Sequence, residues 1–470
     1  MNFSWTCRPV RGARFALLLG LAAAATSSPA GAAEGLSLAA ALRQAGGGND
    51  ALRASGEAVA EARELRGVAD ALVWPTVEMR ARAARMDDPL RIDLSPLRGL
   101  LLELNPAVPP SAIPPLGLDV LDRDFVRADV HFVWPIYAGG KIAAARRAGQ
   151  ARVEAAEAAH GRENETLAAD VVERYFALRL ALDAADVRRE VLADLERHVA
   201  DATRLEAEGQ IARADLLHAE VARAEADRAL KRALHDVALA RVALADLLGV
   251  ADVEQAPTTA LFAPRDVPAL EFFRERARTE NPLLAALDAR RRAADSAADA
   301  ERAARRPEVV AFGSRELRKD DLTVLDPTWS VGVEARFTLF DGLARPRRIA
   351  AAEAASREAS YVRRQAERDV ETAVERWYRE LARAREQYDA LGAARALAEE
   401  NLRTRQHGFD EAMATSLDVV DARVALAAVR LETLAAARDF DVALGRLLAA
   451  ARLSSSYLDY LPREGAEVTR

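Results

Sequence analysis

The feature that most constrains this chain is an internal repeat. The segment Pro135–Lys141 and its counterpart Thr338–Ala344 each close a run of alternating polar and apolar residues and open a long Ala-rich run. Gly139 and Gly342, one in each segment, are 203 residues apart. A second pair of similar segments follows each glycine after 70 residues, beginning at Gly209 and at Ala412. A spacing that holds across long segments indicates a duplicated architecture.

Upstream of the alternating runs the repeat has a different spacing. Asn49 precedes Asn281, and Pro75 precedes Pro307, by 232 residues in both cases. The difference between the two spacings is 29 residues, so the first repeat contains an insertion between Pro75 and Gly139. We place it at 87–124, a stretch rich in Leu and Pro.

Two pairs of alternating runs predict four β-strands, each with one apolar and one polar face. The runs are Thr76–Met86, Phe125–Trp134, Glu308–Leu317 and Trp329–Leu339. Their length is enough to cross a bilayer when tilted. Aromatic residues stand near their ends, as in the interfacial girdles of membrane barrels: Trp74, Trp134, Tyr137 and Phe340 on one side, and Trp329 on the other. Because four strands cannot close a barrel, a membrane location requires several copies of the chain.

The rest of the chain reads as long helices. Charged residues make up 30% of it and aromatic residues only 5%, which favours helical hairpins over a compact enzyme core. Apolar residues recur at helical spacing, and we expect two antiparallel hairpins that turn near Gly209 and Ala412. In the N-terminal helical region we expect a break at Gly46–Gly48.

The first residues have the features of a secretory signal peptide. Three arginines precede the apolar run Phe15–Ala25, and Ala30–Ala32 offers small residues for cleavage. Cleavage there would remove Cys7, which is the only cysteine. The expected organisation is a signal peptide at 1–32, an N-terminal helix at 33–74, a first strand pair at 75–137 with its extracellular insertion at 87–124, a first hairpin at 138–248, an irregular connection at 249–268, a helix at 269–306, a second strand pair at 307–340, a second hairpin at 341–453 and a tail at 454–470.

Nothing in the sequence indicates an enzyme. The six histidines, at positions 131, 160, 198, 218, 235 and 407, show no metal-ligand spacing. Nucleophile, phosphate-binding and dinucleotide motifs are missing from the sequence. We therefore expect no catalytic, metal-binding or cofactor-binding residues, and no cofactor. The net charge of −7, with acids interleaved among the arginines, argues against nucleic acid as a partner.

The layout resembles the TolC-like outer-membrane efflux family over nearly the whole mature chain. Two paired motifs carry the resemblance: the strand-to-helix junctions at Tyr137–Gly140 and Phe340–Gly342, and the hairpin tips at Gly209–Leu217 and Ala412–Val420. The resemblance implies a mostly α-helical fold with a transmembrane β-barrel. Three chains would form one twelve-stranded barrel in the outer membrane and a long α-barrel through the periplasm.

The resemblance also implies a function and its site residues. The protein would be the passive exit channel of a tripartite efflux or type I secretion system. Its tips, at Gly209, Asp215 and Ala412, would dock to a periplasmic adaptor protein and an inner-membrane pump. Asp418 and Asp421, spaced i, i+3 on one helix face, would form an acidic gate at the periplasmic mouth. Six carboxylates around a narrow opening would raise some of their pKa values and attract cations.

The sequence departs from the family pattern at three tip positions. Phe409 stands where the family often has a tyrosine, so no hydroxyl can reach Asp215. Ala414 replaces a basic residue, and Ala412 replaces a glycine. How the mouth is held closed is left open by the sequence, as are the cargo, the pump family and the role of the insertion. The alternative function is a periplasmic or surface coiled-coil scaffold without a pore, which would not need apolar strand faces.

Overall fold

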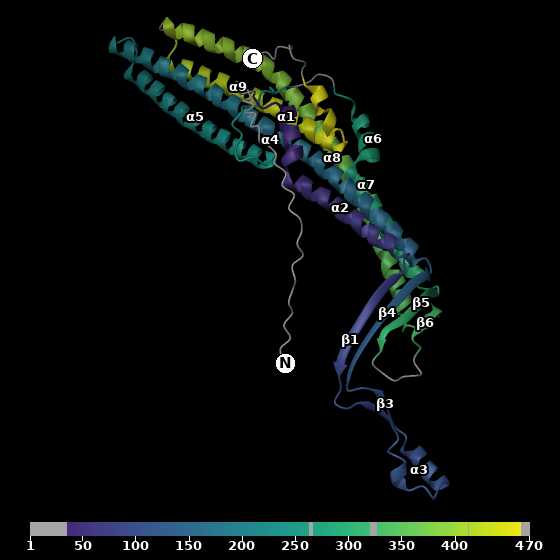
Figure 1. The fold of residues 1–470 in the computed structure, drawn as a ribbon. Coiled ribbons are helices and arrows are strands. Elements are labelled where there is room, and N and C mark those ends of the chain that lie inside the picture. Colours follow the sequence, from purple (N-terminus) through teal and green to yellow (C-terminus); the bar gives the residue numbers. More distant parts are fainter. Residues whose placement is uncertain (1–34, 263–266, 320–326, 412, 462–470) are drawn as a thin grey trace, which may run out of the picture.

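The computed structural model describes residues 35–262, 267–319, 327–411 and 413–461. The expected signal peptide and Ala412 lie outside these residues. The molecule is elongated, with a sheet of strands toward one end and the turns of two long helical hairpins at the other (Figure 1).

Four strands form one antiparallel sheet in the order β1-β4-β5-β6, which confirms the two predicted strand pairs. Their bounds are β1 Thr76–Arg85, β4 Asp124–Tyr137, β5 Glu308–Lys319 and β6 Trp329–Arg336. Val77 lies opposite Phe132 and Glu78 opposite His131, so the apolar and polar faces of β1 and β4 stay in register. The side chains of Val77 and Val331 are 67% and 66% exposed, which leaves an apolar face uncovered by this chain.

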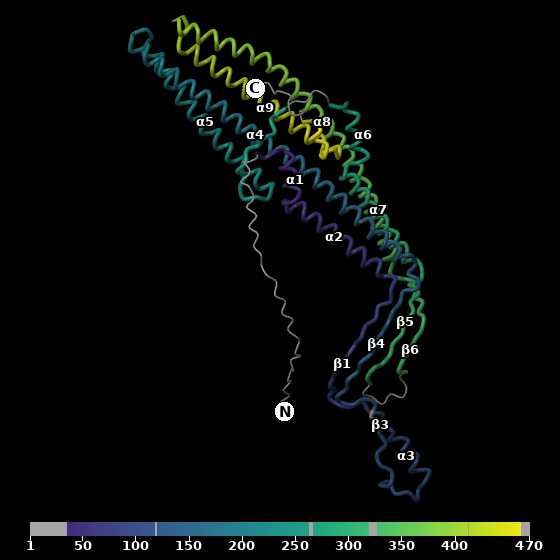
Figure 2. The backbone as a smooth tube through the Cα atoms, turned by 45° about the horizontal axis from the view of Figure 1, so that its top comes forward, coloured from purple at the N-terminus to yellow at the C-terminus, as the bar shows by residue number. Residues whose placement is uncertain are grey.

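The insertion between β1 and β4 forms a small unit beyond the sheet, at the end of the molecule opposite the hairpin turns (Figures 1 and 2). It contains the ribbon of β2 (Leu90–Asp93) and β3 (Gly117–Leu121), with α3 (Ser95–Leu104) and the short 3-10 helix η1 (Pro110–Ala112) between them. Arg98 of α3 donates hydrogen bonds to the carbonyl groups of Ile113 and Pro110, which fold the Pro-rich loop back onto the helix.

Two helical hairpins make up most of the molecule. The first consists of α4 (Lys141–Ala207) and α5 (Arg213–Leu248), and the second of α8 (Ala344–Asp410) and α9 (Ser416–Ala450). Both confirm the predicted hairpins. No described helix is long and apolar enough to cross a membrane.

The order of the strands continues into the helices nearest to them. Helix α2 (Asp50–Ala71) precedes β1, α4 follows β4, α7 (Pro282–Ala303) precedes β5, and α8 follows β6. These four helices pack side by side in the order α2-α4-α7-α8, the same order as the strands they continue. Farther from the sheet, α5 and α9 take the places of α2 and α7 beside α4 and α8. The sheet and the helices therefore form one continuous curved layer (Figure 2).

A pair of equivalent asparagines marks the helix breaks in the two repeats. Helix α1 (Leu38–Gly48) ends before Asn49, and α6 (Leu270–Glu280) ends before Asn281. Each asparagine side chain caps the following helix and donates a hydrogen bond to the end of a hairpin: Asn49 to the carbonyl of Leu247 (3.3 Å), and Asn281 to that of Ala450 (2.8 Å). The two acceptors are themselves 203 residues apart, so this link belongs to the repeat.

The expected break in the helical run is present but lies at Asn49, directly after Gly46–Gly48, because α1 runs through Gly48. Glycine disfavours a helix but does not end it when tertiary contacts hold the backbone. Here Gly48 lies against the end of α5, where a Cβ atom would come within 2.7 Å of the carbonyl oxygen of Leu248.

The main core lies where the hairpins meet the short helices. Its large buried side chains come from α4, the connection between the repeats, α9 and the C-terminal 3-10 helix η2 (Ser454–Tyr460): Tyr175, Phe176, Phe262, Phe440 and Tyr457. Tyr175 accepts a hydrogen bond from the backbone N–H of Thr259 and donates one to the carbonyl of Leu36. It thereby fixes the N-terminal segment and the connection to the first hairpin.

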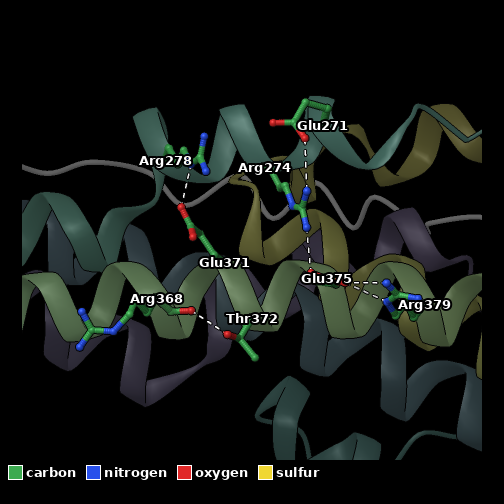
Figure 3. Close-up of polar contacts among 8 residues, drawn as sticks. All are labelled: Glu271, Arg274, Arg278, Arg368, Glu371, Thr372, Glu375 and Arg379. Carbon is green, nitrogen blue, oxygen red and sulfur yellow. Dashed lines mark hydrogen bonds and ion pairs between the residues drawn. The ribbon is translucent and has the colours of Figure 1, made fainter.

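Helix α6 lies on α8 through a ladder of ion pairs (Figure 3). Arg274 pairs with Glu375 and Arg278 with Glu371, both at 2.8 Å. Glu375 also pairs with Arg379 one turn farther along α8. Apolar contacts accompany these ion pairs, because Phe273 of α6 is fully buried and packs against Tyr378 of α8 with ring centroids 6.2 Å apart.

Candidate functional site

The first strand-to-helix junction is built around two glycines with left-handed backbone conformation. Tyr137 ends β4, and Gly139 and Gly140 follow with φ angles of 64° and 101°. A Cβ atom on Gly139 would lie 2.8 Å from the carbonyl oxygen of Ala303, at the end of α7. Arg306 donates a hydrogen bond to the carbonyl of Gly139 (3.1 Å). Glycine is therefore needed both for the turn and for its close packing.

The second junction has the same backbone but looser surroundings. Gly342 has a φ angle of 66°, and no atom would contact an added Cβ. Leu343 also has a left-handed conformation, with φ of 65°, at the position equivalent to Gly140. Asp341 accepts a hydrogen bond from the N–H of Arg345 in the first turn of α8. Phe340, 78% exposed, projects from the junction.

The first hairpin tip closes with a glycine. Gly209 follows α4 with φ of 71°, and the N–H of Gln210 donates to the carbonyl of Leu205 (2.8 Å). Such a left-handed residue satisfies the last carbonyl groups of a helix. Helix α5 then begins after Ala212, which has no side chain that can cap it, and Asp215 lies in its first turn.

The second tip is closed by side chains. Thr415 and Asp418 form a reciprocal capping box at the start of α9, in which each side chain accepts from the backbone N–H of the other residue. Asp418 also pairs with Arg405 of α8 (3.3 Å). The hydrogen bonds from Thr415, with a smaller contribution from Arg405, lower the pKa of Asp418 below its usual value.

Both predicted gate residues thus lie on α9 near the second tip, but they differ in their surroundings. Asp418 has a structural role at the start of the helix, and its pKa is lowered within the single chain. Asp421, one turn later, is exposed. The expected rise in pKa depends on neighbouring copies of the chain and stays a prediction, as does the gate itself.

The structure shows a buried contact near the tips that the sequence did not single out. Phe409 of α8 is buried and packs against His198 of α4, with ring centroids 4.9 Å apart. The Nε2 atom of His198 lies 2.7 Å from the Oγ atom of Ser416 on α9. The available signal was the position of His198 three residues after Leu195, on the apolar stripe of α4.

Asp441 is a second buried group that the sequence did not single out. It lies on α9 with no exposed surface, and its Oδ2 atom accepts from the N–H of Phe262 (3.3 Å). Its Oδ1 atom has no hydrogen-bond partner among the described residues. Burial raises the pKa of Asp441 well above its usual value, so the carboxyl group favours its protonated form.

The described residues contain no group of three or more His, Cys, Asp or Glu side chains arranged to hold a metal ion. The features that stand out are instead an uncovered apolar strand face, two glycine junctions and two hairpin tips.

Comparison with known proteins identifies the family. The model of the family described as outer membrane efflux protein matches residues 41–250 and 274–451. Protein CyaE of Bordetella pertussis is 30% identical over 285 residues, which cover 57% of this chain and 59% of that protein. The chain thus matches less than two thirds of the length of this relative.

Solved structures share the fold at low sequence identity. The CmeC outer membrane channel of Campylobacter jejuni superimposes with a TM-score of 0.73 at 14% identity, over 91% of this chain and 90% of that one. The open state of the MtrE outer membrane channel of Neisseria gonorrhoeae has a TM-score of 0.71 at 18% identity, over 88% of both chains. Since the family model spans most of the sequence and the strand and hairpin arrangement agrees with it, the chain belongs to the outer membrane efflux protein family, whose place is the outer membrane.

Proposed function

We propose that this protein is a passive exit duct that three copies form through the outer membrane and the periplasm. The observation that carries the proposal is the shared order of β1-β4-β5-β6 and α2-α4-α7-α8. A sheet that closes around an axis would continue directly into a helical wall around the same axis. One passage would therefore run through both parts.

The two edges of the sheet support closure by further copies. Among the described residues, β1 and β6 each pair with a single neighbouring strand, so both lie at an edge of the sheet. Unpaired backbone groups in hydrocarbon cost several kcal/mol each, so both edges need partners in a membrane. Pairing of β6 with β1 of the next copy would give a closed barrel of twelve strands from three chains. The exposed faces of Val77, Met79, Val331 and Val333 would then contact lipid.

We assign the docking of partner proteins to the hairpin tips. They lie at the end of the molecule opposite the sheet, where a wall of this length would reach into the periplasm (Figure 1). We propose that Gly209, Asp215 and Ala412 mark the surface that docks to a periplasmic adaptor protein and, through it, to an inner-membrane pump. The periplasmic mouth is the opening of the duct at the tips. Asp418 and Asp421 would place negative charge around this opening and form its gate.

Membrane fractionation and planar-bilayer recording test the duct. The full-length protein should be found in the outer membrane and should form pores in bilayers. A protein found wholly in the soluble periplasmic fraction would contradict the proposal and favour the alternative, a coiled-coil scaffold without a pore.

The gate requires a finer design because Asp418 also caps α9. The double variant Asp418→Asn, Asp421→Asn removes both charges while asparagine keeps the capping oxygen. We expect it to reduce block of the pore by divalent cations added on the periplasmic side. Thr415→Ala is the matched control, since it disturbs the cap but keeps both carboxylates. If block is unchanged in the double variant, these residues are not the gate.

A further inference from the structure

His198 connects the two hairpins close to their tips. Its side chain, only 1% exposed, projects from α4 between α8 and α9. The ring packs on Phe409 of α8, and its Nε2 atom lies at hydrogen-bond distance from Ser416, the first residue of α9. One imidazole on α4 of the first repeat thus contacts two helices of the second repeat. We call these contacts of His198 with Phe409 and Ser416 the latch.

The Nδ1 atom of His198 has no hydrogen-bond partner among the described residues. A neutral imidazole has one N–H group and one lone pair, so Nε2–H can donate to Ser416 while Nδ1 keeps its lone pair. Protonation would place a second N–H, carrying charge, at this unpartnered position. A buried charged donor without an acceptor is costly. The arrangement therefore fits the neutral ring and not the imidazolium.

A cation beside the latch reinforces this preference. Arg423 of α9 is half-buried; its Nη2 atom donates to Gln406 of α8 (2.8 Å), and its Nη1 atom lies 3.6 Å from a carboxylate oxygen of Asp194. Its Nε and Nη1 atoms make no hydrogen bond among the described residues. The charge of Arg423 is thus only partly compensated.

Charged groups from three helices act on His198. Burial lowers its pKa most and Arg423 lowers it further, whereas Asp201 of α4, the contact with Ser416 and Asp410 of α8 act in the opposite direction. The net pKa lies below the usual value of 6.5. Burial lowers the pKa of Arg423, and so does Arg197 of α4. Asp194 and Asp201 of the same helix raise it. Next to the latch, α5 contributes the apolar residue Ala226 to a small core with Leu195 and Val420.

We propose that neutral His198 holds the two hairpins together near their tips and that its protonation releases α4 from α8 and α9. This release takes place within a single chain and does not require the assembled duct. Its effect on transport, a looser periplasmic mouth in acid, rests on the proposed duct.

The direction of the pH dependence follows from linkage. Because the pKa of His198 is lower in the folded than in the unfolded state, the unfolded or locally opened state binds more protons below the unfolded value of 6.5. The stability of the latch is therefore complete above that pH. It declines as the pH falls from there toward the folded pKa.

Hydrogen–deuterium exchange on the purified full-length protein tests the latch without requiring a pore. Peptides that cover 194–206 and 405–423 report opening at the latch, after correction for the intrinsic pH dependence of exchange. We expect their protection to be lower at pH 5.0 than at pH 7.5, because the opened state binds the additional proton. His198→Gln, which cannot titrate, should lose this step.

Two controls separate His198 from its neighbours. His407 is a second histidine near the tips; it is exposed on α8 and its Nε2 atom lies 3.2 Å from a carboxylate oxygen of Glu411. His407→Gln should keep the step, and a step that vanishes in this variant but remains in His198→Gln would overturn the proposal. A wild-type protein without any step would overturn it as well.

A third variant keeps the test valid if His198→Gln fails to fold. Arg423→Gln removes the nearby cation, and the pKa of His198 should rise, which moves the midpoint of the step to higher pH. An unchanged midpoint would contradict the proposal. Bilayer recordings then distinguish the latch proposal from the duct proposal. If the protein shows the pH-dependent step in hydrogen exchange but forms no pore, the latch is supported and the duct is contradicted.

Discussion

In the first repeat the short helix α1 packs on α4 within an apolar core, whereas in the second repeat its counterpart α6 packs on α8 through buried apolar residues and, in addition, through ion pairs (Figure 3). The positions equivalent to Arg274 and Glu375 hold Leu42 and Val172. Both residues belong to or pack against the main core. The same placement of elements is therefore compatible with a purely apolar contact and with one that adds ion pairs at its edge.

The elements that are alike in the two repeats act through the backbone. The asparagine links and the left-handed turns at Gly139 and Gly342 fix where helices begin, end and change direction. The side chains that fill the space between them differ. This difference indicates that backbone geometry defines the duplicated shape, and the following substitutions test that conclusion.

The largest difference between equivalent positions is expected at the junctions. Gly139→Ala should cost about 3 kcal/mol, since it combines left-handed strain with a clash against the carbonyl of Ala303. Gly342→Ala has the strain without the clash and should cost about 1 kcal/mol. Thermal unfolding of the two variants side by side measures the gap, and equal losses would show that the packing at Gly139 is unimportant.

The asparagine links should respond alike. Asn49→Ala and Asn281→Ala each remove a helix cap and the hydrogen bond to a hairpin end, at a cost of about 2 kcal/mol. Losses that agree within about 0.5 kcal/mol in thermal unfolding would show that the links are equivalent. A loss confined to one repeat would break the symmetry.

Asp441 has no acidic equivalent, because Ala238 stands at its position in the first repeat. Its folded pKa is raised, so the wild-type protein loses stability as the pH rises through that value. Asp441→Asn removes the ionisable group and should stabilise the fold by about 1 kcal/mol at pH 8 and less at pH 5. Melting curves across this pH range check the trend. A stabilisation that does not grow with pH would mean that Asp441 is not the group responsible.

Helix α9 after the second tip has a side-chain cap, whereas α5 after the first tip has none. Substitutions can remove the first of these caps or add the second. Thr415→Ala should destabilise the start of α9 by about 1 kcal/mol, whereas Ala212→Ser at the equivalent position should stabilise α5 by about half as much. Hydrogen exchange of the first turns of α9 and α5 measures both effects. If Ala212→Ser gives no added protection, the first tip is held by something other than its cap.

The smallest effect is expected from the ion-pair ladder. The charges of Arg274 and Glu375 are solvent-accessible, so Glu375→Gln should lower the melting temperature only slightly, and less at high salt. Leu42→Ala in the first repeat is the comparison, and its effect should be larger and independent of salt.

The sequence predicted the strands and hairpins because their patterns are local and occur twice. It predicted the helix break slightly too early, at Gly46–Gly48 instead of Asn49, since α1 continues through the three glycines and Gly48 packs against the end of α5. It placed Asp418 near a tip but could not show its capping role, which depends on the turn geometry at Thr415. Asp441 was missed because burial is a tertiary property that its local pattern does not reveal. His198 lies on the apolar stripe of α4, but its contacts with α8 and α9 are tertiary as well.

The asparagine links also define a lever. Beyond Asn49 and its contact at Leu247, the first hairpin extends along the whole of α5, which has 36 residues and a length of about 50 Å. A rotation of about 5° at this fulcrum would move the tip sideways by about 5 Å, the length of one helical turn. Any rotation at the root of a hairpin would thus produce a larger displacement at its far end.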